Sequence, residues 1–347
     1  MISRETLLKI ARYGQMAPSG DNLQDWRFSL KENSIDLIGE FFSHPFNLSH
    51  RASFPGYGAV LENMSIAAQE FGFEMIEDLF PAGGGRDLIA SLRFLELAEK
   101  KPHPLFPFIE KRAVNRRNYS RKELPSQIRK ELIQTAQNSG LGQLFIADVS
   151  LAKKYAAKAA FYGSQVMMER KDVHDALFNS IRWTQRDAEK TRDGLYIKTL
   201  ELRIQEPAFR LLSSWGLTKA LNFLGLSRFA AFQDYRLCLG SSALGLIQIP
   251  NDSPKAVLEG GKLFERFWLK LTSLGLSLQP ETALIFFLYM LRDNPSQFTP
   301  SQRKCLTQGL KMLKEAFSLE NERGILMFFR FGYAAQEPSA RSLRKEI

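Results

Sequence analysis

The chain has 347 residues, of which 44% are hydrophobic and 24% are charged, as in folded globular proteins with a packed core. Its net charge of +10 suits a phosphorylated ligand, but no nucleic-acid-binding motif accompanies it, so we expect no nucleic-acid partner. The two cysteines and four histidines lack metal-ligand spacing, so we expect no metal site. Neither a signal peptide nor a membrane-spanning apolar run is recognisable, and we expect a cytoplasmic protein with no membrane partner.

The first predicted elements alternate between helix and strand. Residues 7–30 predict a helix, a small polar turn and a strand, in that order. Residues 58–73 carry apolar side chains at three- and four-residue spacing, which is typical of a helix with a long buried face. A strand over residues 92–94 follows, with a proline soon after it.

A second series repeats this order later in the chain. Residues 130–149 again predict a helix, a turn and a strand, residues 261–276 a helix, and residues 329–331 a strand. The two long helices match at two glycines and two glutamates: Gly58 with Gly261, and Glu62 with Glu265. The matched order predicts an internal repeat, with two unrelated α+β stretches as the alternative.

The second series is longer than the first. Residues from about 151 to 235 have no counterpart in the first series, and their apolar spacing predicts helices. An insertion of this length is typical of a surface lid. A buried strand is then expected over residues 237–249.

Residues 17–28 form the most distinctive candidate binding loop. A proline and a glycine shape a turn after the first helix. Ser19, Asn22 and Gln24 are short uncharged side chains that donate and accept hydrogen bonds, as the ring edge of a flavin also does. On this chemistry alone, an ordinary loop capped by serine and asparagine is the alternative.

The same loop resembles the APSxxNxQPW loop of the nitroreductase superfamily, with Asp25 where proline is common. The resemblance implies that Pro18, Ser19, Asn22 and Gln24 contact the flavin ring of FMN.

A basic run resembles a second motif of that family. The segment from Arg112 to Arg116 is similar to its Arg-x-Ser/Thr-x-Arg signature, which implies that both arginines bind the FMN phosphate. Val114 stands where the family has a hydroxyl, so one hydrogen bond to the phosphate is lost. A solvated basic face is the alternative for this run.

The last two matching segments lie near the end of the chain. Residues 274–282 resemble the family's GLxxxP element, where the backbone after the proline approaches flavin N5. The contacts that this implies are Gln279, Pro280, Glu281 and Thr282. The end of the chain resembles the RxGY strand and its closing basic residues, which implies that Arg341 and Arg344 complete the phosphate site. A solvated tail is the alternative.

Together the motifs imply an α+β fold of the nitroreductase type, most similar to its fused, Acg-type branch. Two tandem halves would form a pseudo-dimer, each half with a mainly antiparallel sheet flanked by helices. We expect the first half at residues 1–105 and the second at residues 106–347, with the lid-like insertion at about 151–235. The motifs then combine into one FMN site between the halves. Because the usual dimer interface would lie inside one chain, a monomer is plausible.

The resemblance implies an FMN-dependent oxidoreductase that uses NADH or NADPH to reduce the flavin and then reduces a small-molecule acceptor. No catalytic side chain is expected, because flavin N5 carries the hydride. The alternative is an FMN-sequestering protein whose insertion covers the site and which has no turnover.

Overall fold

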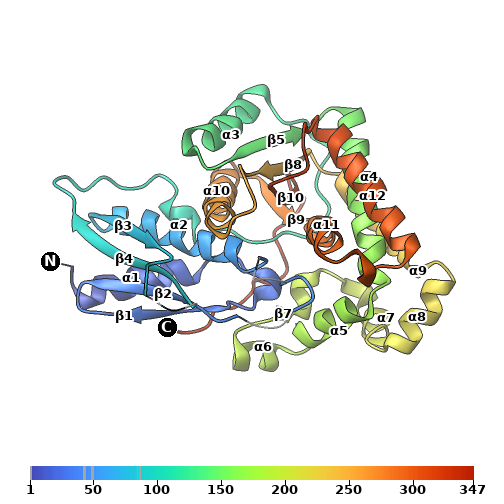
Figure 1. Cartoon of the computed structure of the whole chain (residues 1–347), viewed down its shortest axis with the longest axis horizontal. Helices are drawn as coiled ribbons and strands as arrows, with labels where there is room; N and C mark the ends of the chain where they lie inside the picture. Colours follow the sequence, from blue (N-terminus) through green and yellow to red (C-terminus); the bar gives the residue numbers. More distant parts are fainter. Residues whose placement is uncertain (1, 42–43, 48–50, 84, 86) are drawn as a thin grey trace.

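The computed structural model describes residues 2–347 except residues 42–43, 48–50, 84 and 86. Two four-stranded antiparallel sheets flanked by helices dominate the fold (Figure 1), which confirms the predicted α+β class. Among the described residues, no helix is both long enough and apolar enough to cross a membrane.

The first sheet is formed by the N-terminal part of the chain. It has the strand order β1-β2-β4-β3, and every neighbouring pair is antiparallel. The elements in chain order are α1 (Arg4–Gln15), the short 3-10 helix η1 (Gly20–Asn22), β1 (Trp26–Leu30), β2 (Ser34–Gly39), α2 (Phe54–Glu70), β3 (Phe73–Leu79) and β4 (Leu88–Glu96).

The second sheet has the order β5-β8-β10-β9, again antiparallel throughout. Its elements, with the helices that belong to it, are α3 (Ser126–Ser139), β5 (Gln143–Ala147), β8 (Ala243–Gln248), α10 (Pro254–Ser273), β9 (Ser277–Pro280) and β10 (Ile325–Gly332). This order of helix, two strands, helix and two strands is the same as in the first series, and corresponding strands occupy corresponding places in the two sheets.

Helices fill most of the chain between β5 and β8. They are α4 (Ser150–Met168), α5 (Lys171–Ser180), α6 (Gln185–Thr191), α7 (Glu206–Leu211), α8 (Trp215–Phe223) and α9 (Leu226–Leu239). A short parallel pair, β6 (Ile181–Arg182) with β7 (Leu195–Tyr196), and two 3-10 helices, η4 (Ile197–Leu200) and η5 (Arg203–Gln205), complete this segment. The strand predicted over 237–249 is shorter than expected, because α9 continues to Leu239.

A further helical segment separates β9 from β10, and the sequence patterns did not predict it. It contains α11 (Ala283–Asp293), the 3-10 helix η6 (Pro295–Gln297) and α12 (Pro300–Phe317). Helix α12 packs on α4, so the two inserted segments share one apolar core with the outer side of the second sheet. Another 3-10 helix, η3 (Phe106–Phe108), lies between the two sheets in sequence.

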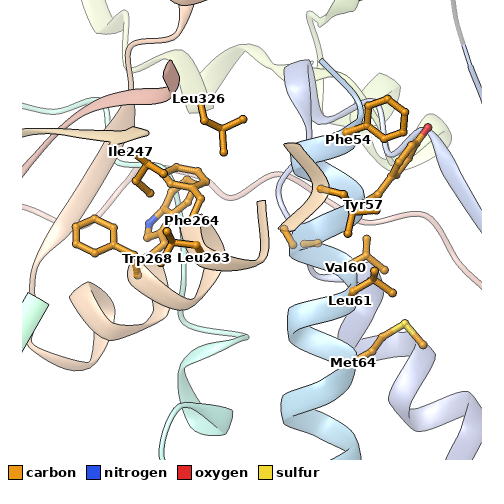
Figure 2. Close-up of a cluster of buried hydrophobic side chains, with 14 of the residues drawn as sticks. Phe54, Tyr57, Val60, Leu61, Met64, Ile247, Leu263, Phe264, Trp268 and Leu326 are labelled. Carbon is orange, nitrogen blue, oxygen red and sulfur yellow. The ribbon is translucent and has the colours of Figure 1, made fainter. Parts of the chain in front are cut away.

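Helices α2 and α10 pack against each other at the centre of the molecule, and each carries apolar side chains into the core (Figure 2). Two glycines allow this contact. A Cβ added to Gly58 would lie 1.9 Å from the carbonyl oxygen of Leu258, and one added to Gly261 would lie 2.3 Å from that of Pro55. The two glycines that the sequence alignment matched therefore meet at the same helix crossing.

Candidate functional site

A cavity of about 500 Å³ lies where the two sheets and the inserted helices meet. Its wall combines the loop after α1, the basic run before α3, the β9–α11 connection and the C-terminal tail. Phe264 and Trp268 of α10 supply apolar surface. The predicted residues that line it are Pro18, Ser19, Asn22, Arg112, Arg116, Gln279, Pro280, Glu281, Thr282, Arg341 and Arg344. The structure thus brings together four segments that are far apart in sequence.

Gln24 is the predicted residue that does not line this cavity. Its side chain is fully buried and donates to the carbonyl of Arg192 at 2.8 Å. Its Oε1 accepts from the Gln15 side chain and from the backbone N–H of Lys345. The amide therefore joins the loop to the insertion and to the tail. Its hydrogen-bonding atoms point into the protein, and the flavin contact of Gln24 stays a prediction.

Asn22 lines the cavity, but its amide also has protein partners. Its Nδ2 donates to the carbonyls of Gly194 and Leu343 at 3.1 Å each, and its Oδ1 accepts from Arg344 at 2.7 Å. Its φ of 56° lies in the left-handed region, which asparagine tolerates better than most residues. Asn22 therefore fixes the shape of the loop and leaves little polar capacity for a ligand.

Three arginines donate to backbone carbonyls at two places: the end of α1 and the two residues before Arg112. Arg112 and Arg344 both donate to the carbonyl of Met16, and Arg341 donates to the carbonyls of Glu110 and Lys111. The segments that carry them lie more than 200 residues apart, and the tail connects them.

The arginine cluster, formed by Arg112, Arg341 and Arg344, has more positive charge than the acid beside it can balance. Glu265, which is fully buried, lies 2.9 Å from Nε of Arg112. Burial and the positive charge of Arg112 together lower the pKa of Arg344 to about 9, while Glu265 opposes the shift. The buried Nε of Arg344 has no hydrogen-bond partner among the described residues. Arginine forks match the oxygens of a phosphate, so a bound anion of this kind would balance the charge and complete the unpaired donor.

Arg116 has different partners from Arg112, although the motif groups them. Its Nη1 donates to the carbonyl of Thr199 at 3.0 Å. Burial lowers its pKa, and the nearby carboxylates of Asp21 and Glu281 oppose this shift. Between the two arginines, Val114 pairs with Leu278 of β9 in an isolated bridge. Their contacts therefore do not indicate that both arginines bind one phosphate, because Arg116 is hydrogen-bonded to the insertion.

The β9–α11 connection presents two polar side chains to the cavity. Oε1 of Gln279 accepts from Nη2 and Nε of Arg330 at 2.6 and 3.0 Å. The backbone N–H of Glu281 donates to the carbonyl of Phe328 at 2.8 Å. This N–H is therefore used by the strand pairing of the second sheet, and the approach of the backbone after Pro280 to a flavin stays a prediction.

The carboxyl of Glu281 is buried beside a second acid. Burial and the nearby Asp234 raise its pKa to about 8, while Arg330 and Arg116 oppose the shift. Nε of Arg330 lies 3.6 Å from Oε1 of Glu281. Burial also raises the pKa of Asp234, which comes from α9 and lines the same cavity. Near neutral pH the pair formed by Glu281 and Asp234 therefore retains a proton.

Asp234 and Arg330 were missed by sequence reasoning. Arg330 is the arginine of the RxGY pattern, which is the sequence signal for its fully buried guanidinium. Asp234 has no sequence signal, because it lies in the insertion and reaches the cavity through the packing of α9 on α4. Among the described residues, no group of three or more His, Cys, Asp and Glu side chains could hold a metal ion.

The insertion forms part of the cavity wall. Leu195, Thr199 and Leu200 line it. The backbone N–H of Gly194 donates to the carbonyl of Asn22 at 3.2 Å. Residues 194–200 therefore lie across the loop that the first part of the chain supplies.

No family model matches the chain, and no curated protein matches it. Among solved structures, it is similar to the FMN-dependent nitroreductase NfnB from Mycobacterium smegmatis, with 15% identity over 69% of this chain and 92% of that chain and a TM-score of 0.40. It is similar to a nitroreductase with bound FMN from Bacteroides fragilis, with 12% identity over 70% and 94% of the two chains and a TM-score of 0.36. A nitroreductase-like family protein from Bacillus cereus has 10% identity over 72% and 95% and a TM-score of 0.35.

Proposed function

We propose that the chain is an FMN-binding oxidoreductase of the nitroreductase type, which takes hydride from NADH or NADPH and reduces a small-molecule acceptor. The observation that carries this proposal is the convergence of Arg112, Arg341 and Arg344 beside the cavity that also holds the Pro18–Ser19 loop. Each of these residues belongs to a motif that resembles the same cofactor site.

The chemistry of the donors fits FMN. Arg112, Arg341 and Arg344 would hold the phosphate, for which the unpaired buried Nε of Arg344 is the clearest support. A cavity of about 500 Å³ is within the size range of small-molecule sites. Trp268 and Pro280 offer the apolar walls that a flat aromatic ring requires.

We further propose that the site lies between two fused halves, residues 1–105 and 106–347, which together form a pseudo-dimer. The support is the equal element order of the two series and the meeting of Gly58 with Gly261 at one helix crossing. The ring-contacting loop comes from the first half and the three phosphate arginines from the second. This arrangement gives one site in each chain, and because the packed interface is internal, we propose that the protein acts as a monomer.

When bound, FMN supplies the hydride chemistry, which accounts for the lack of a nucleophile or an acid–base dyad in the motifs. The protein's own residues have three tasks. The arginine cluster binds the phosphate and fixes its position. Leu195 and Leu200 exclude water from one side. The Glu281 carboxyl, whose pKa is raised to about 8, holds a proton inside the cavity near neutral pH.

The second candidate function is FMN sequestration without turnover. It is favoured by the contacts of the insertion: Gly194 exchanges hydrogen bonds with Asn22, and Thr199 accepts from Arg116. These contacts lie across the cavity and would hinder the approach of a second substrate to a bound flavin.

One experiment separates the two functions. The protein is loaded with FMN, freed of unbound flavin, and mixed with NADH or NADPH without oxygen while the flavin absorbance is followed. A reductase loses this absorbance and regains it when a nitroaromatic or quinone acceptor is added. Flavin that stays oxidised with both donors, yet is bleached by dithionite, supports sequestration. A protein that takes up no FMN contradicts both functions.

A further inference from the structure

Large apolar side chains are exposed on the outer surface of α8 and α9, away from the cavity. The exposed fractions are 92% for Phe223, 78% for Leu224, 63% for Phe229 and 49% for Phe232. The first two lie at the turn between the helices, so they stand at the tip of a helical hairpin. In Figure 1 this hairpin lies at the end of the molecule opposite the first sheet.

The exposure is a fixed feature of the hairpin, because its inner side is anchored. Nδ2 of Asn222 donates to the carbonyl of Met168 at 2.7 Å, and the Ser227 hydroxyl donates to Glu169 at 3.0 Å. Ala231 is fully buried against the rest of the protein. With this side held against the protein, the apolar side chains at the tip lie on the outer surface.

Cations share the outer surface with the apolar side chains. Arg228, Phe232 and Arg236 are four residues apart along α9, so they lie on one helix face. Lys219 is exposed on α8. No acidic side chain lies within ion-pair distance of these three cations among the residues that the structure describes. The face therefore combines apolar tips with unbalanced positive charge.

We propose that this hairpin, residues 215–236, binds the surface of an anionic lipid bilayer. Apolar side chains from one helix face enter the boundary between headgroups and acyl chains, and lysines and arginines beside them contact anionic headgroups. A second copy of this chain suits the face less well, because two such faces would bring cations against cations. The proposed binding is peripheral and independent of the flavin site, and it differs from the expectation of no membrane partner.

The test is co-sedimentation of the full-length protein with vesicles. Vesicles that contain phosphatidylglycerol should carry the protein down, whereas pure phosphatidylcholine vesicles should bind it at least about tenfold more weakly, because three cations contribute. The double variant Phe223→Glu, Leu224→Glu should lose at least about tenfold in the bound-to-free ratio. The matched control is Leu95→Glu, Leu151→Glu, which changes two other exposed leucines by the same charge and should bind as the unchanged protein does.

A triple variant tests the charges separately. Lys219→Gln, Arg228→Gln, Arg236→Gln retains the apolar tips and should lose the preference for anionic vesicles. Thermal unfolding of every variant shows whether it has kept its fold. The proposal is overturned if the unchanged protein stays in the supernatant with anionic vesicles, or if both double variants bind equally. A dimer in sedimentation velocity that Phe223→Glu, Leu224→Glu converts to a monomer, without vesicle binding, also overturns it and assigns the face to a second copy.

Discussion

Replacing Arg112 with methionine tests the buried ion pair beside the cavity. Arg112 and Glu265 have side chains 3% and 0% exposed, and Nε lies 2.9 Å from Oε1. Removing one partner of a buried pair typically costs about 3–5 kcal/mol, because the remaining charge is left in the interior. Since whole domains are stable by about 5–15 kcal/mol, Arg112→Met should lower the free energy of unfolding by a large fraction.

The double variant Arg112→Met, Glu265→Leu separates lost charge balance from lost packing. It removes both charges, and replacing a buried pair by apolar groups is often nearly neutral. We therefore expect the double variant to be more stable than Arg112→Met in urea unfolding without added FMN. Arg323→Met, which changes an exposed arginine, is the control and should leave stability within about 0.5 kcal/mol. A double variant as unstable as the single one would refute the reasoning.

The pH dependence gives a second readout of the same perturbation. Burial raises the pKa of Glu265 above its ordinary 4.5, and Arg112 opposes that shift. Without Arg112 the pKa rises further, and a carboxyl with a raised folded-state pKa favours folding most below its unfolded pKa. The stability deficit of Arg112→Met should therefore be smallest at acidic pH and grow as pH rises. A deficit that does not change with pH would show that Glu265 is not the group left uncompensated.

Three further predictions concern the cofactor site, the acid corner and the helix crossing. Arg344→Gln should weaken FMN binding by roughly 10- to 100-fold in calorimetric titration, because a charged donor is lost; unchanged affinity would place the phosphate elsewhere. Glu281 has its pKa raised to about 8 from 4.5, so its contribution to stability should decline as pH rises between these values. Thermal unfolding of Glu281→Gln should lack that decline, and an identical profile would argue against it. Gly58→Ala should destabilise by about 1–3 kcal/mol, since its Cβ would meet the Leu258 carbonyl at 1.9 Å; Gly20→Ala, with open space around it, is the control in denaturant unfolding.

Much of the fold could be predicted from apolar periodicity. The helices expected over 58–73 and 261–276 correspond to α2 (Phe54–Glu70) and α10 (Pro254–Ser273). Their starts were placed too late, because the first turn of each holds a proline that periodicity does not register. The α11–α12 segment was missed because no first-series counterpart drew attention to it.

The sequence predicted which residues line the site better than it predicted the contacts that these residues make. Motif resemblance selected residues from four distant segments, and all except Gln24 line one cavity. What each side chain does there depends on tertiary partners. The bonds of Gln24 to Arg192 and Lys345, and the use of the Glu281 N–H by Phe328, could not be read from local sequence. The exposed hairpin tip likewise needed the packing of α8 and α9 to be known.

The stoichiometry of FMN binding tests most directly whether two unequal halves form one FMN site, as we propose. Calorimetric titration of the purified, flavin-free chain should give one FMN bound for each chain. Two equivalents for each chain would contradict the unequal distribution of the motifs, and no binding would contradict the flavin site itself.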